Sequence, residues 1–462
     1  MKHFDVVLLG GGSAAEWIWS HLPGKSVAVV EANRVGGECP FVSCVPSKAL
    51  LRSAQVRRLV MEAHRLGASS FPLVLDDPTK AFAAAVLRRD RIVDQRDDSE
   101  NEAQLAESGA RLYRGRGRIQ GPGRLIVEDD KGVLEEISYS ELVLATGSSP
   151  VVPPIPGLEL VPTWRSDEAL SSSELPTPLA VMGGGAVGCE LAQVYATFGS
   201  KVTIIEAAEH LLPREDSAVG RILAEALQRS GVNLLMGTKL IKAEPHEVGA
   251  LLTLDTGDQL QAARVLVAVG RRPNIDNIGL ETLGMTLDGN TLEVDAQGRV
   301  AGVDHLWAAG DVTAIAPFTH TAKYQGRIVA QNLRGEARRA DYRAIPRCVY
   351  TDPPVAAVGL TPDEARSLGL EIREASMPLK DTARAASDGT DVGMVKLIED
   401  IQRGVLVGAA IIGQGADEMI VEAALAIRAE LPVSLLADLV HAFPTYGEAY
   451  EVPLMRLEGL EE

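Results

Sequence analysis

The chain has 462 residues, of which 46% are hydrophobic, and its formal net charge is −18 at pH 7. At about 150 residues per domain, this length predicts three domains with ample apolar material for their cores. The acidic balance argues against a nucleic-acid surface, which needs clustered Lys and Arg, and no apolar run approaches the roughly 18 residues of a membrane span.

We expect a buried parallel strand over residues 4–9, followed by a turn with the pattern G-x-G-x-x-A at residues 10–15. The first glycine of this pattern allows the tight turn, the second lets a pyrophosphate approach backbone N–H groups, and the alanine lets the next helix pack on the strand. A second strand, at residues 26–30, ends at Glu31, and an acid at this distance suits the ribose hydroxyls of an adenosine. The pattern predicts a dinucleotide site.

Two of the four cysteines stand next, in the segment Gly36-Gly37-Glu38-Cys39-Pro40-Phe41-Val42-Ser43-Cys44-Val45-Pro46-Ser47-Lys48. Thiols this close can form a strained disulfide ring, and a Cys pair near a βαβ pattern is more often redox or metal-binding than structural. A zinc site would need two more ligands, and no second Cys/His cluster follows, so we expect no metal site. The low cysteine count, and a strand that leaves no room for a signal peptide, lead us to expect a cytoplasmic protein.

The cysteine segment matches the pattern GGxCxxxxCxPSK at every fixed position. It thereby resembles the active site of the pyridine nucleotide–disulfide oxidoreductases, a family that includes dihydrolipoamide dehydrogenase, glutathione reductase and mercuric reductase. The resemblance implies an α/β fold with two Rossmann-like dinucleotide-binding domains, for FAD and NAD, and a C-terminal α+β dimerisation domain. We expect an FAD-binding segment at residues 1–150, an NAD(P)-binding domain at 151–270, a central FAD-binding segment at 271–340 and an interface domain at 341–462.

The dinucleotide-binding pattern recurs at residues 183–188, after a strand at 179–182, and a further strand ends at Glu206. In the family, the first such unit holds tightly bound FAD and the second holds the nicotinamide nucleotide. A carboxylate at Glu206 accepts the 2′-hydroxyl of NAD and repels a 2′-phosphate, and no Arg stands at positions 206–209 to bind that phosphate. We therefore expect NADH rather than NADPH.

Further family motifs are the Thr146-Gly147 turn, the Gly270-Arg271 crossing and the Gly310-Asp311 motif, in which the Asp binds the ribitol chain of the flavin. The residues that we expect at the cofactors are Gly10, Gly12, Ser13, Ala14, Glu31, Gly37, Lys48, Thr146, Gly147, Gly183, Gly185, Val187, Gly188, Glu206, Gly270, Arg271, Gly310 and Asp311.

The resemblance implies a two-electron relay from NADH through the flavin to the Cys39–Cys44 disulfide and on to an acceptor. Cys44 would be the thiol at the flavin, and Cys39 the interchange thiol that attacks the substrate. We expect Cys44 just before a helix that begins around Ser47, whose N-terminus stabilises a thiolate. Lys48 would approach the flavin N5 and pair with Glu190, because a buried lysine needs an opposite charge.

The C-terminal segment departs from the family at its proton-transfer site. Disulfide reductases of the family carry His-Pro-Thr-x-x-Glu, in which the His, from the other subunit, protonates the leaving thiolate and the Glu orients it. Aligned on Pro444, Thr445 and Glu448, the His position holds Phe443, and His441 matches only a preceding, non-catalytic histidine. A positioned general acid–base contributes about 10²- to 10⁴-fold in rate, so we expect weak activity on ordinary disulfides. Glu448, a water or a shifted His441 are the alternatives for this role.

These observations predict an FAD-dependent NADH oxidoreductase of the dihydrolipoamide dehydrogenase type, a homodimer that reduces a small oxidised acceptor. A disulfide, a quinone and a metal ion stay open as acceptors. Among metal ions, we expect mercuric ion to be a less favoured acceptor. Mercuric reductases carry a C-terminal cysteine pair and an N-terminal metal-binding domain, and we expect neither here, since residues 457–462 hold no cysteine. A role of another class also stays open, as a subunit of a multienzyme complex or as a flavin-bound redox sensor.

Overall fold

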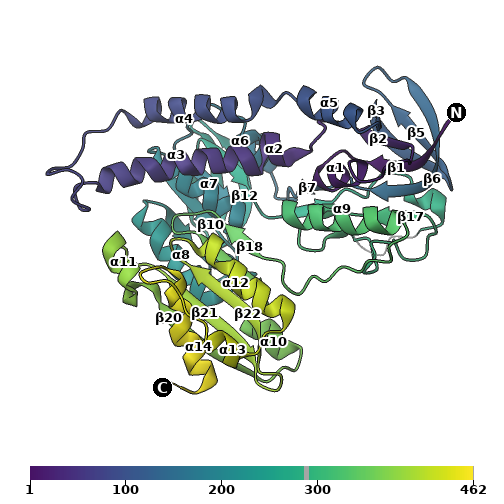
Figure 1. Ribbon diagram of the computed structural model, residues 1–462. Helices are drawn as coiled ribbons and strands as arrows, with labels where there is room; N and C mark the ends of the chain where they lie inside the picture. The colour runs from purple at the N-terminus through teal and green to yellow at the C-terminus, as the bar shows by residue number, and fades with distance from the viewer. Residues whose placement is uncertain (286–290, 461–462) are drawn as a thin grey trace. The chain divides into compact units, whose positions relative to one another are not determined.

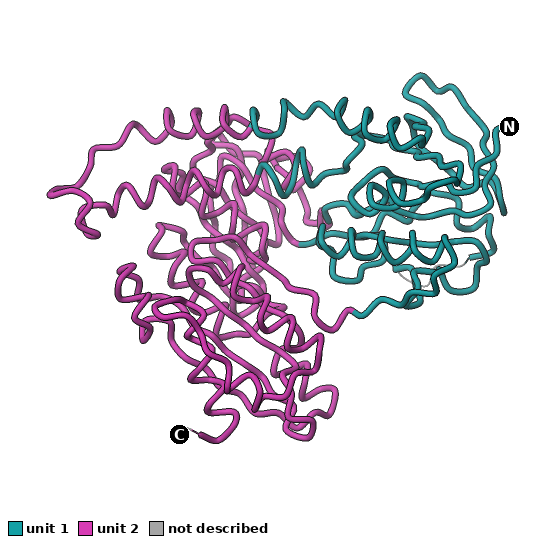
Figure 2. The backbone as a smooth tube through the Cα atoms, viewed as in Figure 1, with its two compact units in different colours: residues 1–46, 90–151, 270–341 teal, residues 47–89, 152–269, 342–462 magenta. Residues whose placement is uncertain are grey.

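The computed structural model describes residues 1–285 and 291–460, which form two compact units (Figure 2). Unit 1 comprises residues 1–46, 90–151 and 270–341, and unit 2 comprises residues 47–89, 152–269 and 342–462. Positions 286–290 of the expected central segment and 461–462 of the expected interface domain lie outside the described residues.

Unit 1 is built on a sheet with the strand order β3-β2-β1-β6-β5-β4, in which β17 also pairs with β6. Its strands are β1 (Lys2–Leu9), β2 (Val27–Glu31), β3 (Arg111–Arg114), β4 (Arg116–Gly121), β5 (Arg124–Glu128), β6 (Leu134–Leu144) and β17 (Leu306–Ala308). β1 runs parallel to both β2 and β6, with Val6 opposite Val27 and Glu141. The apolar, buried residues 6–9 of β1 and 27–30 of β2 are typical of parallel strands that are covered on both faces.

The helices of unit 1 surround this sheet, and Figure 1 shows α1 beside α9. Its helical elements are α1 (Ser13–Trp19), α2 (Glu38–Val42), η1 (Asp94–Arg96), α5 (Ser99–Glu107), η3 (Leu280–Leu283), η4 (Asp311–Thr313) and α9 (Thr319–Leu333). A short antiparallel pair, β7 (Ser148–Pro150) with β16 (Arg271–Pro273), stands where the chain leaves and re-enters the unit.

Unit 2 contains a parallel sheet in the order β11-β10-β9-β15-β8, the antiparallel set β12-β13-β14, and an antiparallel sheet in the order β18-β19-β22-β21-β20. The strands are β8 (Thr163–Trp164), β9 (Leu179–Met182), β10 (Val202–Ile205), β11 (Asn233–Leu235), β12 (Leu240–His246), β13 (Gly249–Leu254), β14 (Gln259–Ala262), β15 (Arg264–Val267), β18 (Arg347–Val349), β19 (Val355–Gly359), β20 (Ile372–Pro378), β21 (Met394–Asp400) and β22 (Val405–Ile412).

The helical elements of unit 2 are η2 (Leu158–Leu160), α6 (Ser166–Ala169), α7 (Ala186–Thr197), α8 (Ser217–Arg229), α10 (Pro362–Ser367), η5 (Leu379–Asp381), α11 (Ala383–Asp388), α12 (Ala416–Ala429), α13 (Val433–Ala437), η6 (Gly447–Tyr450) and α14 (Glu451–Glu458). Two further helices, α3 (Cys44–Glu62) and α4 (Pro78–Ile92), have most of their length in unit 2. The parallel sheet with helices and the later antiparallel sheet with helices confirm the expected α/β class with a C-terminal α+β part.

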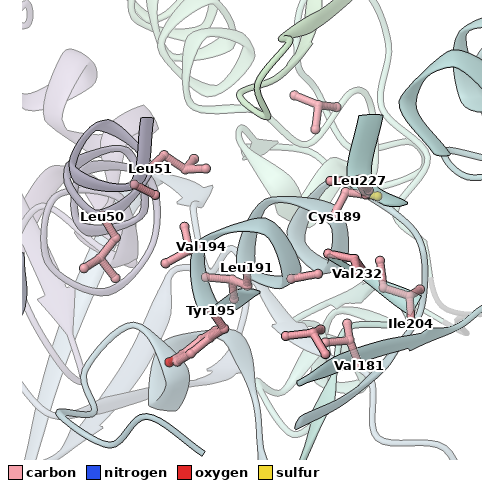
Figure 3. Packing of buried hydrophobic residues seen from close by; sticks show 14 of the residues in the cluster. Leu50, Leu51, Val181, Cys189, Leu191, Val194, Tyr195, Ile204, Leu227 and Val232 are labelled. Carbon is pink, nitrogen blue, oxygen red and sulfur yellow. The ribbon is translucent and has the colours of Figure 1, made fainter. Parts of the chain in front are cut away.

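A large core cluster in unit 2 joins α3 to the parallel sheet (Figure 3). It includes Leu50 of α3, Val194 and Tyr195 of α7, and Val181 of β9, all fully buried. Truncating a fully buried Leu to Ala costs about 2–5 kcal/mol of unfolding free energy, so this cluster fixes the direction of the helix that carries Cys44 and Lys48. Among the described residues, no helix is long and apolar enough to cross a membrane.

Candidate active site

The two cysteines lie on consecutive helices of the chain. Cys39 is the second residue of α2, and Cys44 is the first residue of α3. The prediction of a helix that begins around Ser47 is therefore wrong. Pro46 falls within the first turn of α3, where a missing N–H costs nothing because the first-turn N–H groups have no acceptor inside the helix. The positive end of the α3 dipole is then at Cys44 itself, where it stabilises a thiolate.

The sulfur atoms have polar neighbours within unit 1. Cys44 Sγ lies 3.4 Å from Thr319 Oγ1 and 3.9 Å from Ser43 Oγ. A hydrogen bond with Cys44 and burial raise the pKa of the Cys39 thiol far above its ordinary value, while the Thr319 hydroxyl and the Lys323 ammonium oppose this shift. The thiolate role that the family resemblance implies for Cys44 stays a prediction.

The first glycine turn has the shape that a bound pyrophosphate requires. Gly10 has φ 106°, and a Cβ there would lie 2.2 Å from the carbonyl oxygen of Ala145. A Cβ on Gly12 would meet only Gly37 Cα, at 3.9 Å, so the backbone N–H groups at this turn stay approachable. Ser13 begins α1, and its neighbour Ala14 is buried against the core.

Glu31 ends β2 beside this turn. One of its carboxylate oxygens accepts the N–H of Gly11 and the other accepts the N–H of Asn33, both at 2.6 Å. Burial raises the pKa of Glu31, although these two backbone donors oppose the shift. Each oxygen keeps a free lone pair for a ribose hydroxyl, so the carboxylate is held in place for a nucleotide.

A chain of polar contacts connects the cysteine segment with the second flavin motif. Arg271 Nη2 donates to Oε2 of Glu38, the residue before Cys39, at 2.7 Å. Arg271 Nε donates to Ser148 Oγ, also at 2.7 Å. Ser148 Oγ donates in turn to Asp311 Oδ2 at 2.6 Å. Sequence reasoning missed Ser148, because nothing local marks a serine as the link between distant motifs.

Three further glycines of the expected flavin site adopt left-handed backbone conformations. Gly147 has φ 70°, Gly270 has φ 123° and Gly310 has φ 88°. The turn at Gly147 is held by Thr146, whose hydroxyl donates to the carbonyl of Asn274 at 2.7 Å. A side chain at these three positions would be strained, so they are glycines for conformational reasons.

The second glycine turn, in unit 2, repeats this geometry. Gly183 has φ 104°, and a Cβ on Gly188 would lie 1.9 Å from the Gly183 carbonyl oxygen, so the start of α7 can pack closely. A Cβ on Gly185 would meet nothing within 4 Å, which leaves the backbone open to a pyrophosphate. Val187, in the first turn of α7, is exposed.

Glu206 takes the place in unit 2 that Glu31 takes in unit 1. Its carboxylate oxygens accept the N–H of Gly184 at 2.6 Å and of Ala208 at 2.7 Å. The side chain is buried, and no Arg occupies positions 206–209. A fixed carboxylate at this place can accept ribose hydroxyls and repels a phosphate.

Lys48 and Glu190 form an ion pair in unit 2. Lys48 Nζ lies 3.0 Å from Glu190 Oε2 and 3.2 Å from Oε1, and Glu190 Oε1 also accepts the N–H of Tyr350 at 2.9 Å. The Lys48 ammonium lies 4.5 Å from the centre of the Tyr350 ring. Because Glu190 is buried, its carboxylate needs this ammonium as a partner.

His441 is held inside the C-terminal part of unit 2. Its Nε2 lies 3.1 Å from Glu422 Oε1 and its Nδ1 lies 3.3 Å from Glu451 Oε1, and its side chain is 8% exposed. Nε2 is therefore hydrogen-bonded to a carboxylate of unit 2, whereas Nδ1 is buried near Glu451 without a hydrogen-bond partner among the described residues. Nothing in the local sequence marked Glu422 as a partner, since α12 lies earlier in the chain.

Phe443 is 78% exposed, although it is a large apolar residue. On the same segment, Glu448 Oε1 is buried and has no hydrogen-bond partner in the described part of the chain. The segment thus presents an aromatic ring where a proton donor is expected, together with a carboxylate oxygen whose partner is missing. This arrangement cannot transfer a proton through an imidazole at position 443.

Comparison with known proteins agrees with this geometry. The sequence model of the pyridine nucleotide-disulphide oxidoreductases matches residues 4–326, and that of their dimerisation domain matches residues 345–453. Fold and site define a flavoprotein with two dinucleotide-binding units and a redox cysteine pair. The chain belongs to the pyridine nucleotide-disulphide oxidoreductase family.

The relatives include enzymes with different acceptors. The chain is 31% identical to a dihydrolipoyl dehydrogenase of Zymomonas mobilis, over 99% of this chain and 98% of the other. It is 32% identical to a mercuric reductase of Acidithiobacillus ferrooxidans, over 97% of this chain and 81% of the other. A solved Cu(II) complex of the HOCl-induced flavoprotein disulfide reductase RclA from Escherichia coli is similar with a TM-score of 0.86 and 29% identity, over 99% of this chain and 100% of the other.

FAD and a pyridine nucleotide are the cofactors of this family. The residues present fit both groups, because each glycine turn leaves an open backbone face and each has a fixed carboxylate after the next strand. FAD, when bound, supplies the transfer of two electrons between a nicotinamide and a disulfide. The chain itself contributes the cradle, the cysteine pair and the charges around it.

Proposed function

We propose that the protein is an FAD-dependent NADH oxidoreductase that passes electrons through Cys39 and Cys44 to a small acceptor, a quinone in the first place. The proposal is carried by the exposed ring of Phe443, which occupies the expected position of the family's proton donor when the motif is aligned on Pro444, Thr445 and Glu448. We do not assign this role to His441, because its side chain is only 8% exposed and its Nε2 is hydrogen-bonded to Glu422.

The proposed roles follow the geometry of each unit. Unit 1 would bind FAD and unit 2 would bind NADH. The four expected segments, 1–150 and 271–340 for FAD, 151–270 for NAD and 341–462 for the interface, stay a prediction, and residues 47–89 of the first segment belong to unit 2. The proposed cofactor ligands are Gly10, Gly12, Ser13, Ala14, Glu31, Gly37, Thr146, Gly147, Gly270, Arg271, Gly310 and Asp311 for FAD, and Gly183, Gly185, Val187, Gly188 and Glu206 for NADH.

Cys39 would attack or reduce the acceptor, Cys44 would carry the thiolate, and Lys48, held by Glu190, would stabilise negative charge on the reduced flavin. Thiol–disulfide exchange releases a thiolate that must be protonated. Without a positioned acid this step loses about 10²- to 10⁴-fold in rate. A quinone accepts the same two electrons with two protons, one from the Cys39 thiol and one from solvent, and no sulfur leaving group departs. Its planar ring can stack on an aromatic side chain such as Phe443.

A metal ion is the second candidate acceptor, because the similar RclA structure is a Cu(II) complex. In the described part of the chain, no group of three or more His, Cys, Asp or Glu side chains is placed to hold a metal. The dithiol of Cys39 and Cys44 would reduce two Cu(II) ions to Cu(I), the oxidation state that soft thiolates suit.

We also propose that the protein is a homodimer. The dimerisation-domain match supports this state, as do the exposed apolar side chains Val421 and Leu425 on α12 and Val440 beyond α13. Large exposed apolar groups on neighbouring elements mark interaction surfaces. Sedimentation should give about twice the chain mass of 49.1 kDa.

Anaerobic steady-state kinetics with NADH test the proposed function. We expect kcat/KM for a simple quinone to exceed that for lipoamide by about tenfold or more, a difference of about 1.4 kcal/mol in barrier. Cu(II) is the third acceptor, and a Cys39→Ser variant is the control for direct electron transfer from the flavin. A larger value for lipoamide would contradict the proposal and would make dihydrolipoamide dehydrogenase the better assignment.

A further inference from the structure

The thiol expected to carry the negative charge has hydroxyl neighbours from distant parts of the sequence. Thr319 Oγ1 lies 3.4 Å from Cys44 Sγ and also interacts with Cys39. Ser43 Oγ, from the residue before Cys44, lies 3.9 Å from the same sulfur. Thr319 is the first residue of α9, a 15-residue helix packed against α1, so its position does not depend on the cysteine segment.

Reduction of the pair changes what these hydroxyls can bind. A hydride from NADH brings two electrons and one proton; the S–S bond breaks, Cys39 takes the proton, Cys44 becomes a thiolate and NAD⁺ leaves. A hydroxyl that donates to an anion makes a charge-assisted hydrogen bond, whereas a disulfide sulfur is a weak acceptor. The Thr319 hydroxyl therefore interacts more strongly with the reduced pair than with the oxidised pair.

The charged side chains near Cys39 and Cys44 do not replace the Thr319 hydroxyl as a stabiliser of the Cys44 thiolate. Lys323, one turn after Thr319 on α9, is exposed to solvent, which screens its charge. Lys48, one turn after Cys44 on α3, is paired with Glu190. Glu38, beside Cys39 on α2, is negative and is paired with Arg271. A neutral donor in contact with the sulfur adds stabilisation that these groups do not supply.

We propose that Thr319, supported by Ser43, is a positioning residue that holds the thiolate of Cys44 and shifts the Cys39–Cys44 couple toward its reduced form. This inference rests on the proposed function, and it adds a property of the acceptor. A couple that is easier to reduce gives up its electrons less readily, so the physiological acceptor must be a stronger oxidant than one that an unstabilised cysteine pair could reduce. A quinone or Cu(II) fits this condition.

The test measures the redox equilibrium of the cysteine pair in the FAD-loaded full-length protein. Thr319→Val keeps the shape and removes the hydroxyl, and Thr319→Ser keeps the hydroxyl. Each protein is equilibrated anaerobically in glutathione buffers, the thiols are trapped with a maleimide, and the labelled Cys39–Cys44 peptide is quantified by mass spectrometry. Thr282→Val is the matched control, because its hydroxyl donates to the backbone carbonyl of Gly279, at 2.6 Å, and not to a sulfur.

A hydrogen bond to a charged group is worth about tenfold or more in an equilibrium constant. Thr319→Val should therefore shift the couple about tenfold toward the disulfide, which is about 30 mV for two electrons. Thr319→Ser should stay within about twofold of the unmodified protein, as should Thr282→Val. The pH at which reduction changes from taking up two protons to one should rise by about one unit in Thr319→Val.

Equal equilibrium constants for Thr319→Val and the unmodified protein would overturn the inference. A shift in Thr319→Val that Thr319→Ser fails to reverse would overturn it too, because the methyl group and not the hydroxyl would then be responsible. If Thr319→Val does not fold, Ser43→Ala carries the test, with a smaller shift in the same direction expected and no shift contradicting the proposal. These measurements contain neither quinone nor lipoamide, so their failure is distinguishable from failure of the proposed function.

Discussion

Replacing Phe443 with histidine should restore the proton donor that the family uses on disulfides. Because Phe443 is 78% exposed, the substitution removes little packing and should change the unfolding free energy by no more than about 0.5 kcal/mol. Glu448 Oε1 is buried without a hydrogen-bond partner in the described residues and is available to orient the new imidazole. Phe443→His therefore adds a proton donor to a site that already has the cysteine pair and Glu448.

The expected gain follows from the rate contribution of a positioned acid–base. At about 10²- to 10⁴-fold, Phe443→His should raise kcat/KM for lipoamide by the equivalent of about 2.7 to 5.4 kcal/mol in barrier. Activity with a quinone should change by less than about threefold. No sulfur leaving group has to be protonated in that reaction, and solvent can supply the proton that the cysteine pair does not. The assay is anaerobic steady-state reduction of each acceptor by NADH.

Phe443→Leu is the matched control, since it removes the ring without adding a proton donor. It should give no gain with lipoamide. The added activity of Phe443→His should depend on Glu448, so Phe443→His combined with Glu448→Gln should lose most of it. A folded, FAD-loaded Phe443→His protein with unchanged lipoamide activity would refute the assignment of position 443 to proton transfer.

Further predictions concern the pairs that surround the site. His441→Gln should destabilise the protein in urea unfolding, because the His441 side chain is only 8% exposed and its Nε2 is hydrogen-bonded to Glu422, but it should leave lipoamide turnover unchanged; a loss of turnover would make His441 the acid. Glu206→Gln removes the charge that repels a 2′-phosphate, so the ratio of kcat/KM for NADH to that for NADPH should fall about tenfold, and an unchanged ratio would show that other groups select the nucleotide. A hydrogen bond with Glu141 raises the pKa of His305, so this pair stabilises the fold below about pH 6.5 and its contribution is lost as the pH rises through the raised pKa. His305→Asn should therefore cost up to about 1 kcal/mol at pH 6 and nothing at pH 9, and an equal cost at both pH values would contradict the sign.

The glycine turns could be predicted from the sequence because their requirements are local. The strand, the left-handed glycine and the following helix are adjacent in the chain, and a Cβ at Gly10 or Gly183 would collide with a backbone carbonyl. The pairing of Lys48 with Glu190 could be anticipated from the family motif and from the need of a buried charge for a partner.

Other parts of the site depend on contacts that the sequence does not encode locally. Thr319 stands 275 positions from Cys44, and no motif marks its hydroxyl as a neighbour of the sulfur. The sequence predicts that this helix begins around Ser47, whereas α3 begins at Cys44. Pro46 does not separate the two starts, because proline is compatible both with the first turn of a helix and with the position just before a helix. The environment of His441 depends on Glu422, which α12 brings close only in the folded protein.

The most direct test of the account is the oxidative half-reaction alone. The protein is reduced with one equivalent of NADH and mixed anaerobically, in a stopped-flow instrument, with either a simple quinone or lipoamide. We predict that the quinone reoxidises the protein at least about tenfold faster than lipoamide does. The reaction with lipoamide releases a thiolate, and we expect no positioned proton donor for it. Reoxidation by lipoamide at an equal or higher rate would contradict the account, since another group would then supply the proton that Phe443 cannot supply.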